Sequence, residues 1–312
     1  MTETTSTTAH VEIPADEHVE GISGELHEIH LQPHIPGVAS DTIFHIGSFP
    51  VTNSFLASFI VMLVLVGFGI TIRASLKKIP GKLQTFFEVI IEQISSLCDQ
   101  ITNDHNLSRK IAPVAITLFL FILFNNWFGL LPGVGSIGMI AMHDGHQTLV
   151  PYLRGGTADI NTTLALALFT VIASNVFGMI TIGVFNVLNK YINVGALKSM
   201  VKNFRKDPTQ IIVAPITFFV GVLEIIGEVA KVASLSFRLF GNVFAGEVLL
   251  ASMAALLAFA VPIPFLFLEV MVGVIQAFIF STLTVVYFTL AAQMHDHEES
   301  HEHDVEHAQL HT

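Results

Sequence analysis

The stretch that decides the fold is residues 210–259, QIIVAPITFFVGVLEIIGEVAKVASLSFRLFGNVFAGEVLLASMAALLAF. It is apolar over most of its length, and no polar loop divides it. As one helix it would be about 75 Å long at 1.5 Å per residue, more than twice the roughly 30 Å of a bilayer's hydrocarbon core. It must either break or lie steeply tilted. The missing loop favours the tilted helix.

The composition of the whole chain supports a membrane protein. The chain has 312 residues, of which 52% are hydrophobic and 12% charged, and its mean hydropathy is +0.67. Soluble domains carry about 25% charged residues, so a soluble globular protein is excluded. The net charge of -11 argues against nucleic-acid binding. Cys98 is the single cysteine, so no intrachain disulfide can form.

Four further segments have the length and character of membrane spans: 53–73, 111–131, 162–187 and 263–293. The breaker Val261-Pro262-Ile263-Pro264 turns the last two spans into a hairpin. Residues 82–108 instead alternate apolar and acidic positions, the pattern of an amphipathic surface helix. We therefore expect an all-α polytopic membrane protein. It has five membrane-embedded helices, the last two long, tilted and paired as a hairpin, plus one amphipathic surface helix.

The domain boundaries follow from these segments. Residues 1–50 form a polar, acidic amino-terminal segment that we expect to be flexible, residues 51–293 the membrane domain, and residues 294–312 a tail rich in His and acids.

The basic residues predict the topology. Of 14, eleven lie in clusters between spans: Arg73, Lys77, Lys78, Lys82, Arg109, Lys110, Lys190, Lys198, Lys202, Arg205 and Lys206. An excess of Lys and Arg marks cytoplasmic loops. The amino terminus is then outside and the carboxyl terminus in the cytoplasm, which requires an odd number of spans. Loop 132–160, with the lone Arg154, and the turn at Pro262 are placed outside.

The long span carries an unusual set of polar side chains: Glu224, Glu228, Lys231, Arg238, Asn242 and Glu247. A charge at the bilayer centre costs about 2.5–3.5 kcal/mol on insertion scales. At 100° per residue, Glu224, Lys231, Arg238 and Asn242 share one face, whereas Glu247 lies on the opposite side. A plain ion pair between Glu228 and Lys231, three residues apart, remains an alternative to a transport role for this group.

Arg238 has no acidic residue three or four positions away on its helix. Arginine stays charged under all physiological conditions. An unpaired guanidinium at this depth predicts an anionic partner from another helix or chain.

Glu269 and Gln276 of the last span lie seven residues apart, and so on one face. In an antiparallel hairpin, Gln276 reaches the depth of Arg238, while Glu269 comes close to Glu247 nearer the outside. Two close carboxyls resist simultaneous ionisation, so one binds a proton more readily. We interpret the pair as part of a proton path. A purely structural pair facing trapped water is the alternative.

Four collinear motifs resemble subunit a of the rotary F-type ATP synthase. They are SLSFRLFGNVFAGE at 234–247, QAFIF at 276–280, ADINTTLAL at 158–166 and NWFGLLP at 126–132. The resemblance covers roughly residues 40–293.

The resemblance implies a stator subunit in a bacterial plasma (inner) membrane. It lies in lipid beside a ring of c subunits, contacts the subunit b peripheral stalk, and reaches the F1 sector indirectly. Arg238 matches the essential arginine facing the ring carboxylate, and Asn242 and Gln276 match its polar neighbours. Glu247 and Glu269 match the outside half-channel, and Glu224 the cytoplasmic one. At the position of Glu269 many members have a His.

The pattern contains no phosphate loop, catalytic triad or nucleotide site, so we expect the chain to bind neither ATP nor another cofactor, and assign no metal ligand. Two other functions stay open. One is a self-contained ion channel or secondary transporter. The other is a membrane-anchored metal-binding protein using the carboxyl-terminal His residues between 295 and 311.

Overall fold

A computed structural model describes residues 37, 40–74, 81–135, 137–143, 146–184, 187, 210–256 and 261–292. Its helices are α1 (Asn53–Ala74), α2 (Lys82–Thr102), α3 (His105–Gly129), α4 (Ile160–Ile182), α7 (Gln210–Leu256) and α8 (Pro262–Ala292), with the short 3-10 helix η1 (Gly156–Ala158). Five of these described helices, all but α2 and η1, are long and apolar enough to cross a membrane. This confirms the predicted all-α polytopic membrane fold.

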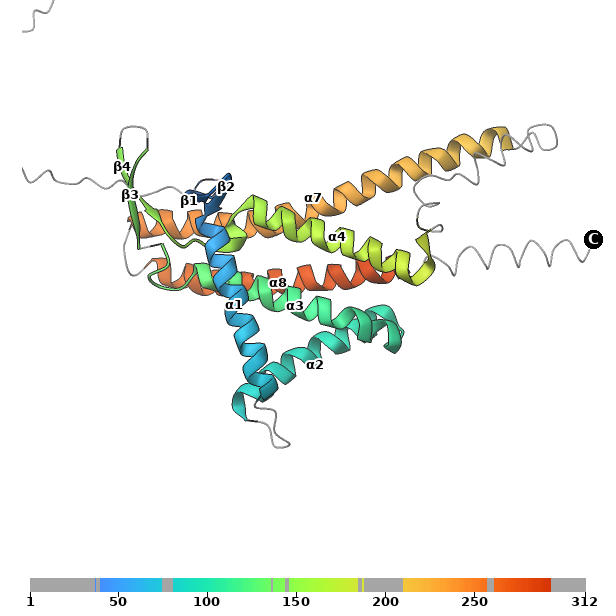
Figure 1. Cartoon of the computed structure of the whole chain (residues 1–312), viewed down its shortest axis with the longest axis horizontal. Coiled ribbons are helices and arrows are strands. Elements are labelled where there is room, and N and C mark those ends of the chain that lie inside the picture. Colours follow the sequence, from blue (N-terminus) through green and yellow to red (C-terminus); the bar gives the residue numbers. More distant parts are fainter. Residues whose placement is uncertain are drawn as a thin grey trace, which may run out of the picture.

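The long apolar stretch forms one unbroken helix from Gln210 to Leu256. Its 47 residues span about 70 Å, so α7 cannot stand upright within a bilayer of ordinary thickness. Figure 1 shows α1 running across the direction shared by α3, α4, α7 and α8. An α1 that crosses the bilayer upright therefore leaves α7 and α8 steeply tilted, as the sequence predicted.

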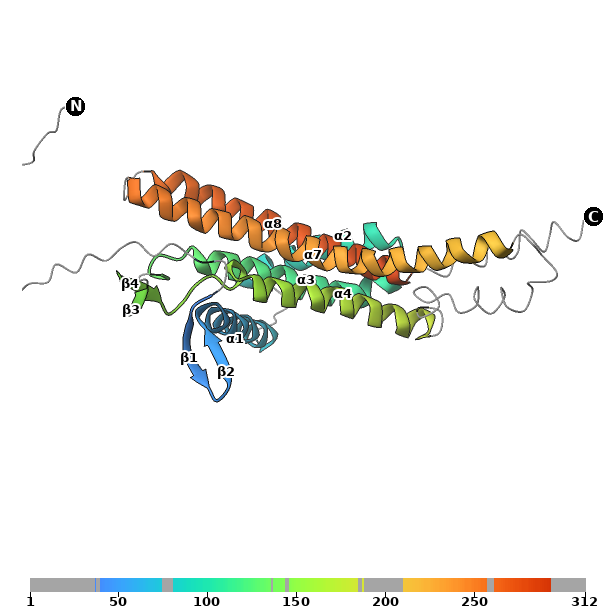
Figure 2. The ribbon, with the colours of Figure 1, turned by 90° about the horizontal axis from the view of Figure 1, so that it is seen from above.

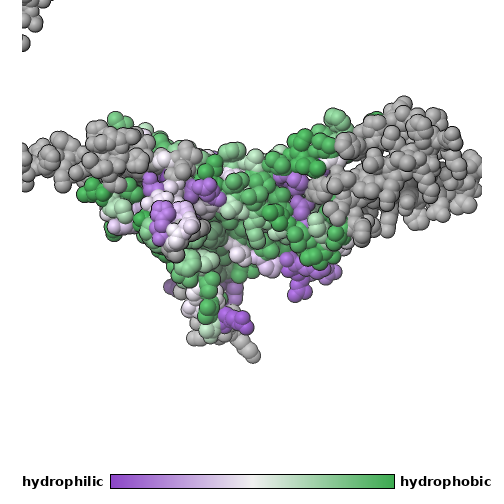
Figure 3. Space-filling model, turned by 45° about the horizontal axis from the view of Figure 1, so that its top comes forward, coloured by the Kyte–Doolittle hydropathy of each residue, from purple (hydrophilic) through white to green (hydrophobic). Residues whose placement is uncertain are grey.

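The helices form successive layers. In Figure 2, α7 and α8 run side by side, α3 and α4 lie next to them, and α1 lies on the far side of α3 and α4. The core lies between α3, α4, α7 and α8, with Ile111, Ile122, Leu239 and Phe280 almost fully buried. Apolar residues also cover much of the outer face that Figure 3 presents, as expected for helices in contact with lipid.

The amphipathic segment is shorter than predicted. α2 ends at Thr102, where Asn103 adopts a left-handed conformation (φ 52°) and terminates the helix. The Asp104 side chain then accepts a hydrogen bond from the Asn106 backbone N–H and begins α3. The apolar face of α2 buries Phe87, Ile94 and Cys98, because it packs against α3 and α8.

Two β-hairpins lie outside the helices and were not predicted. β1 (Thr42–Ile46) pairs with β2 (Phe49–Thr52), and β3 (Gly138–His143) pairs with β4 (His146–Pro151), both antiparallel. The first falls in the amino-terminal segment expected to be flexible, and the second in the loop 132–160. In Figure 1, one end of the bundle holds β3 and β4 together with the end of α7 and the beginning of α8.

Candidate functional site

Arg238 points outward from α7. Its side chain is exposed, whereas its neighbours Leu239 and Leu235 are buried. The Nη2 group donates a hydrogen bond to Ser234 Oγ at 3.3 Å. Within the described residues, Arg238 forms no ion pair. The guanidinium is therefore presented on the surface of the fold with its charge uncompensated.

One helical turn further on, α7 and α8 are joined by their side chains. Asn242 Nδ2 donates to Gln276 Oε1 at 2.7 Å, and Gln276 is only 2% exposed. This bond places Gln276 within one turn of Arg238 along α7, the register predicted from the spacing of the two residues in the hairpin.

Glu247 and Glu269 line the same cavity. Its volume is about 190 Å³, which is room for several water molecules. The other lining residues come from α3, the following loop, η1 and α7: Asn126, Gly129, Leu130, Val134, Gly155, Ala158, Val243 and Leu250. The spacing of Glu247 and Glu269 along the hairpin predicted that the two residues come close together, and both line this cavity.

Glu269 is 7% exposed and makes no hydrogen bond or ion pair with any residue that the structure describes. Its carboxylate lies directly against the backbone of Gly246 on α7, where any side chain would overlap it. The absence of a side chain at Gly246 leaves room for the Glu269 carboxylate in its observed position.

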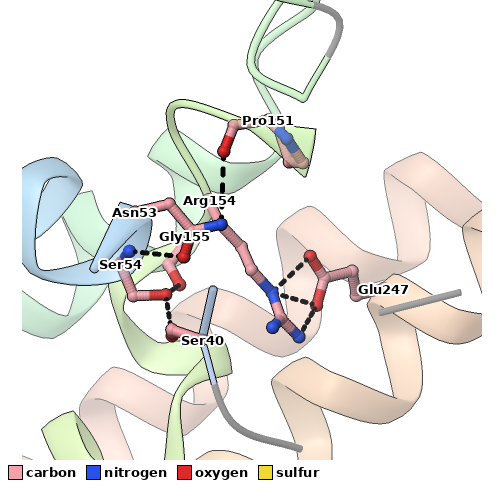
Figure 4. A network of polar contacts seen from close by, with 7 residues as sticks. All are labelled: Ser40, Asn53, Ser54, Pro151, Arg154, Gly155 and Glu247. Carbon is pink, nitrogen blue, oxygen red and sulfur yellow. Dashed lines mark hydrogen bonds and ion pairs between the residues drawn. The ribbon is translucent and has the colours of Figure 1, made fainter. Parts of the chain in front are cut away.

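Glu247 is held by Arg154, a contact that the sequence analysis missed. Arg154 Nη2 donates to Glu247 Oε2 at 2.7 Å, and Arg154 Nε lies 3.1 Å from both carboxylate oxygens (Figure 4). The Arg154 side chain is 3% exposed. Its position in the sequence could have indicated this contact, because Arg154 is the single Lys or Arg residue in a segment predicted to be outside.

The loop carrying Arg154 is fixed by the beginning of α1. Asn53, which is fully buried, donates from Nδ2 to the Pro151 carbonyl at 3.3 Å, and Ser54 Oγ donates to the Gly155 carbonyl at 3.4 Å (Figure 4). These bonds bracket Arg154 on both sides. The first residues of α1 thus hold in place the loop that reaches Glu247.

Polar residues of α3 hold the other side of the cavity. Asn126 accepts a hydrogen bond from Thr157 at 2.6 Å and donates to the Gly273 carbonyl of α8 at 3.2 Å. The Trp127 indole N–H donates to the Val270 carbonyl at 3.3 Å. α8 is thereby tied to α3 within one turn of Glu269.

A second polar cluster lies towards the beginning of α7. Lys231 Nζ lies 2.7 Å from Glu228 Oε1, and Asn175 of α4 donates to Glu228 Oε2 at 3.1 Å. The ion pair that was the alternative interpretation is therefore present. Glu224 is half-buried one turn before Glu228. The adjoining cavity, about 20 Å³, has room for about one water molecule.

Residues 1–36, 38 and 39 of the predicted amino-terminal segment 1–50 lie outside the described residues, and so does the whole predicted tail 294–312 with its His residues. Within the described part, no group of three or more His, Cys, Asp or Glu residues could hold a metal ion.

Comparison with known proteins identifies the family. A family model described as ATP synthase A chain matches residues 55–289. This chain belongs to the ATP synthase A chain family. It is 36% identical over 237 residues to an ATP synthase subunit a from Syntrophobacter fumaroxidans, covering 76% of this chain and 82% of that one. It is also 31% identical over 255 residues to the subunit a of Mycobacterium bovis, covering 80% and 89%.

A third relative spans more of the chain. The ATP synthase subunit a of Acidothermus cellulolyticus is 29% identical over 281 residues, which is 87% of this chain and 90% of that one. The family match and the five apolar helices together establish a multi-pass membrane protein of this family. They confirm the resemblance drawn from the four motifs.

Proposed function

We propose that this chain is the proton-translocating stator subunit of a rotary F-type ATP synthase. It supplies two offset half-channels that lead to a carboxylate on a neighbouring c ring, and Arg238 separates them. Membership of the ATP synthase A chain family supports this function. The observation that carries it is the outward-facing guanidinium of Arg238 on a long apolar helix, where it forms no ion pair with any residue that the structure describes.

Arg238 acts on the ring carboxylate by its charge. A cation beside a carboxylate favours the ionised form, so the ring carboxylate releases its proton as it passes Arg238. The permanent charge of arginine also repels a proton crossing directly between the half-channels. Asn242 and Gln276, bonded to each other beside Arg238, keep α7 and α8 together where the ring passes.

The outside half-channel leads through the cavity lined by Glu247 and Glu269, and the cytoplasmic one passes Glu224. Along α7, Glu247 lies nine residues after Arg238, about 13 Å, and Glu224 lies fourteen residues before it, about 21 Å. The two paths therefore approach Arg238 from opposite ends of the tilted helix. This offset requires the ring to turn before a proton can leave by the other path.

Family membership supports a place in a bacterial plasma membrane. The charge pattern supports an amino terminus outside and a carboxyl terminus in the cytoplasm. Its partners would be the c ring, the subunit b peripheral stalk and lipid, with the F1 sector reached through the stalk. Catalysis of ATP synthesis would belong to F1, and this chain would bind no nucleotide.

Replacing Arg238 by Ala in the assembled synthase tests the proposal. We expect assembly to persist, because the side chain is exposed, and coupled ATP synthesis and ATP-driven proton pumping to be lost. Normal pumping by Arg238→Ala would reject the function. Ion transport by the purified chain alone in liposomes would instead identify a self-contained channel or transporter.

A further inference from the structure

The two carboxyl groups of the outside cavity have different environments. Glu247 receives hydrogen bonds from two nitrogens of a buried guanidinium, at 2.7 and 3.1 Å. Glu269, on the opposite helix, has no charged or hydrogen-bonding partner among the described residues. Within the described part of the chain, Glu247 has a compensating cation and Glu269 does not.

We propose that Arg154 is a positioning residue of the outside half-channel. It neutralises Glu247 and fixes it in the cavity wall, and so leaves Glu269 as the carboxyl that gains and loses the travelling proton. This inference rests on the function proposed above and adds a division of roles between its two acidic residues.

The geometry of Arg154 supports a positioning role over a general stabilising one. A guanidinium bound to a carboxylate through two nitrogens fixes the direction of the carboxylate as well as its charge. The backbone on either side of Arg154 is held by Asn53 and Ser54 of α1. A rigid chain of contacts thus runs from α1 through the 151–155 loop to Glu247.

Arg154 also keeps one donor for water. Its Nη1 is buried and bonds to no residue that the structure describes. A buried charged N–H without a partner is strongly unfavourable unless a water molecule accepts from it. The next residue, Gly155, and the bonded Glu247 both line the cavity, which has room for several waters. Arg154 can therefore anchor the first waters of the path as well as Glu247.

A neutralised Glu247 has a consequence for the path. Two ionised carboxylates in one cavity would repel each other and draw in cations. The Arg154–Glu247 pair contributes no net charge, so the charge of the cavity is set by Glu269 alone. Proton binding at Glu269 then switches the cavity between neutral and singly negative.

The test uses four variants of the assembled synthase in inverted membrane vesicles: Arg154→Gln, Arg154→Lys, Glu247→Gln and the double variant Arg154→Gln/Glu247→Gln. The measured quantity is ATP synthesis driven by an imposed proton gradient, divided by the amount of assembled complex. We expect Arg154→Gln to be slower by about tenfold, since it leaves Glu247 negative and unfixed. Arg154→Lys keeps the charge but loses the contact through two nitrogens, so it should be about threefold faster than Arg154→Gln and slower than the parent.

The double variant decides whether Arg154 acts through Glu247. It removes both charges and keeps Glu269, so we expect it to be at least about threefold faster than Arg154→Gln. Equal rates for Arg154→Gln and Arg154→Lys, or a double variant no faster than Arg154→Gln, would overturn the proposal.

The comparison requires that each variant assembles into the synthase. If Arg154→Gln does not assemble, the double variant is compared with Glu247→Gln, which leaves the guanidinium buried and unpaired. The double variant should then be at least as fast, and a slower rate overturns the proposal. Arg238→Ala is measured in parallel. Loss of synthesis in Arg238→Ala together with a parental rate in Arg154→Gln would reject the role of Arg154 and keep the proposed function.

Discussion

Gly246 controls the position of Glu269, the carboxyl that we propose gains and loses the travelling proton. A methyl group at this position on α7 would overlap the Glu269 carboxylate, whereas ordinary van der Waals contact begins at 3.4 Å. In Gly246→Ala the carboxylate must therefore move by about 1 Å. A displacement of this size at a reacting group costs up to about 100-fold in rate.

The fold itself should tolerate the change. The displaced atoms are the far end of a flexible side chain, and overpacking costs about 1–3 kcal/mol. Alanine recovers about 1 kcal/mol through its higher helix propensity. We therefore expect Gly246→Ala to assemble in near-normal amounts but to synthesise ATP from an imposed proton gradient between 10- and 100-fold more slowly.

Two further variants make this prediction specific. Gly67→Ala is the matched control, because a methyl group at Gly67 on α1 meets no atom within 4 Å, and it should retain the parental rate. Gly246→Ala/Glu269→Asp shortens the acidic side chain by one methylene and should recover at least threefold over Gly246→Ala. A parental rate in Gly246→Ala, or no gain from the aspartate, would refute the close approach of Gly246 and Glu269.

The other predictions concern the α7–α8 contact, the second polar cluster and α2. Gln276→Leu removes the hydrogen-bond partner of Asn242 and should reduce coupled proton pumping. The double variant Asn242→Leu/Gln276→Leu should assemble as the parent does. Parental assembly and pumping in both variants would contradict this prediction. Lys231→Met removes the ion pair with Glu228, which should destabilise the assembled complex by about 1–3 kcal/mol and lower its yield. The double variant with Glu228→Gln should restore the yield. Burial, with a smaller effect from the Asp99 charge, raises the pKa of the Cys98 thiol to about 11. At pH 8 the reactive thiolate is therefore about 100-fold scarcer than in an ordinary thiol, and maleimide labelling of the folded protein should be at least that much slower than after denaturation.

The elements that the sequence predicted well are those governed by local pattern and length. The uninterrupted apolar run from 210 gives the long α7, and the prolines after Val261 mark the turn into α8. Counting along an antiparallel hairpin predicted Gln276 at the depth of Arg238, and the structure bonds Gln276 to Asn242, one turn from Arg238. These predictions succeed because helix geometry fixes the spacing of residues along each span.

The features that the sequence did not predict depend on contacts between residues far apart in the chain. Arg154 lies 93 residues before Glu247 in the chain, and no periodic pattern connects a loop residue with a helix residue so far away. The bonds from Asn53 and Ser54 to the same loop are equally non-local. The β1–β2 hairpin was also not predicted. The alternating apolar residues Phe44 and Ile46 before the Gly47 turn form a short pattern within a mostly polar, acidic segment.

The central claim is that Arg238 faces a carboxylate-bearing partner on a ring. Phe237, beside Arg238, is 62% exposed, so a photoreactive benzoylphenylalanine can replace it without disturbing the core. The control position is Phe59, which is 45% exposed. It belongs to α1, the helix on the far side of α3 and α4 in Figure 2. On illumination of the assembled complex, we predict that position 237 cross-links to a small membrane protein with a carboxylate in its apolar segment, and that position 59 does not. Cross-linking of position 237 to lipid alone, in a complex that still synthesises ATP, would contradict the account.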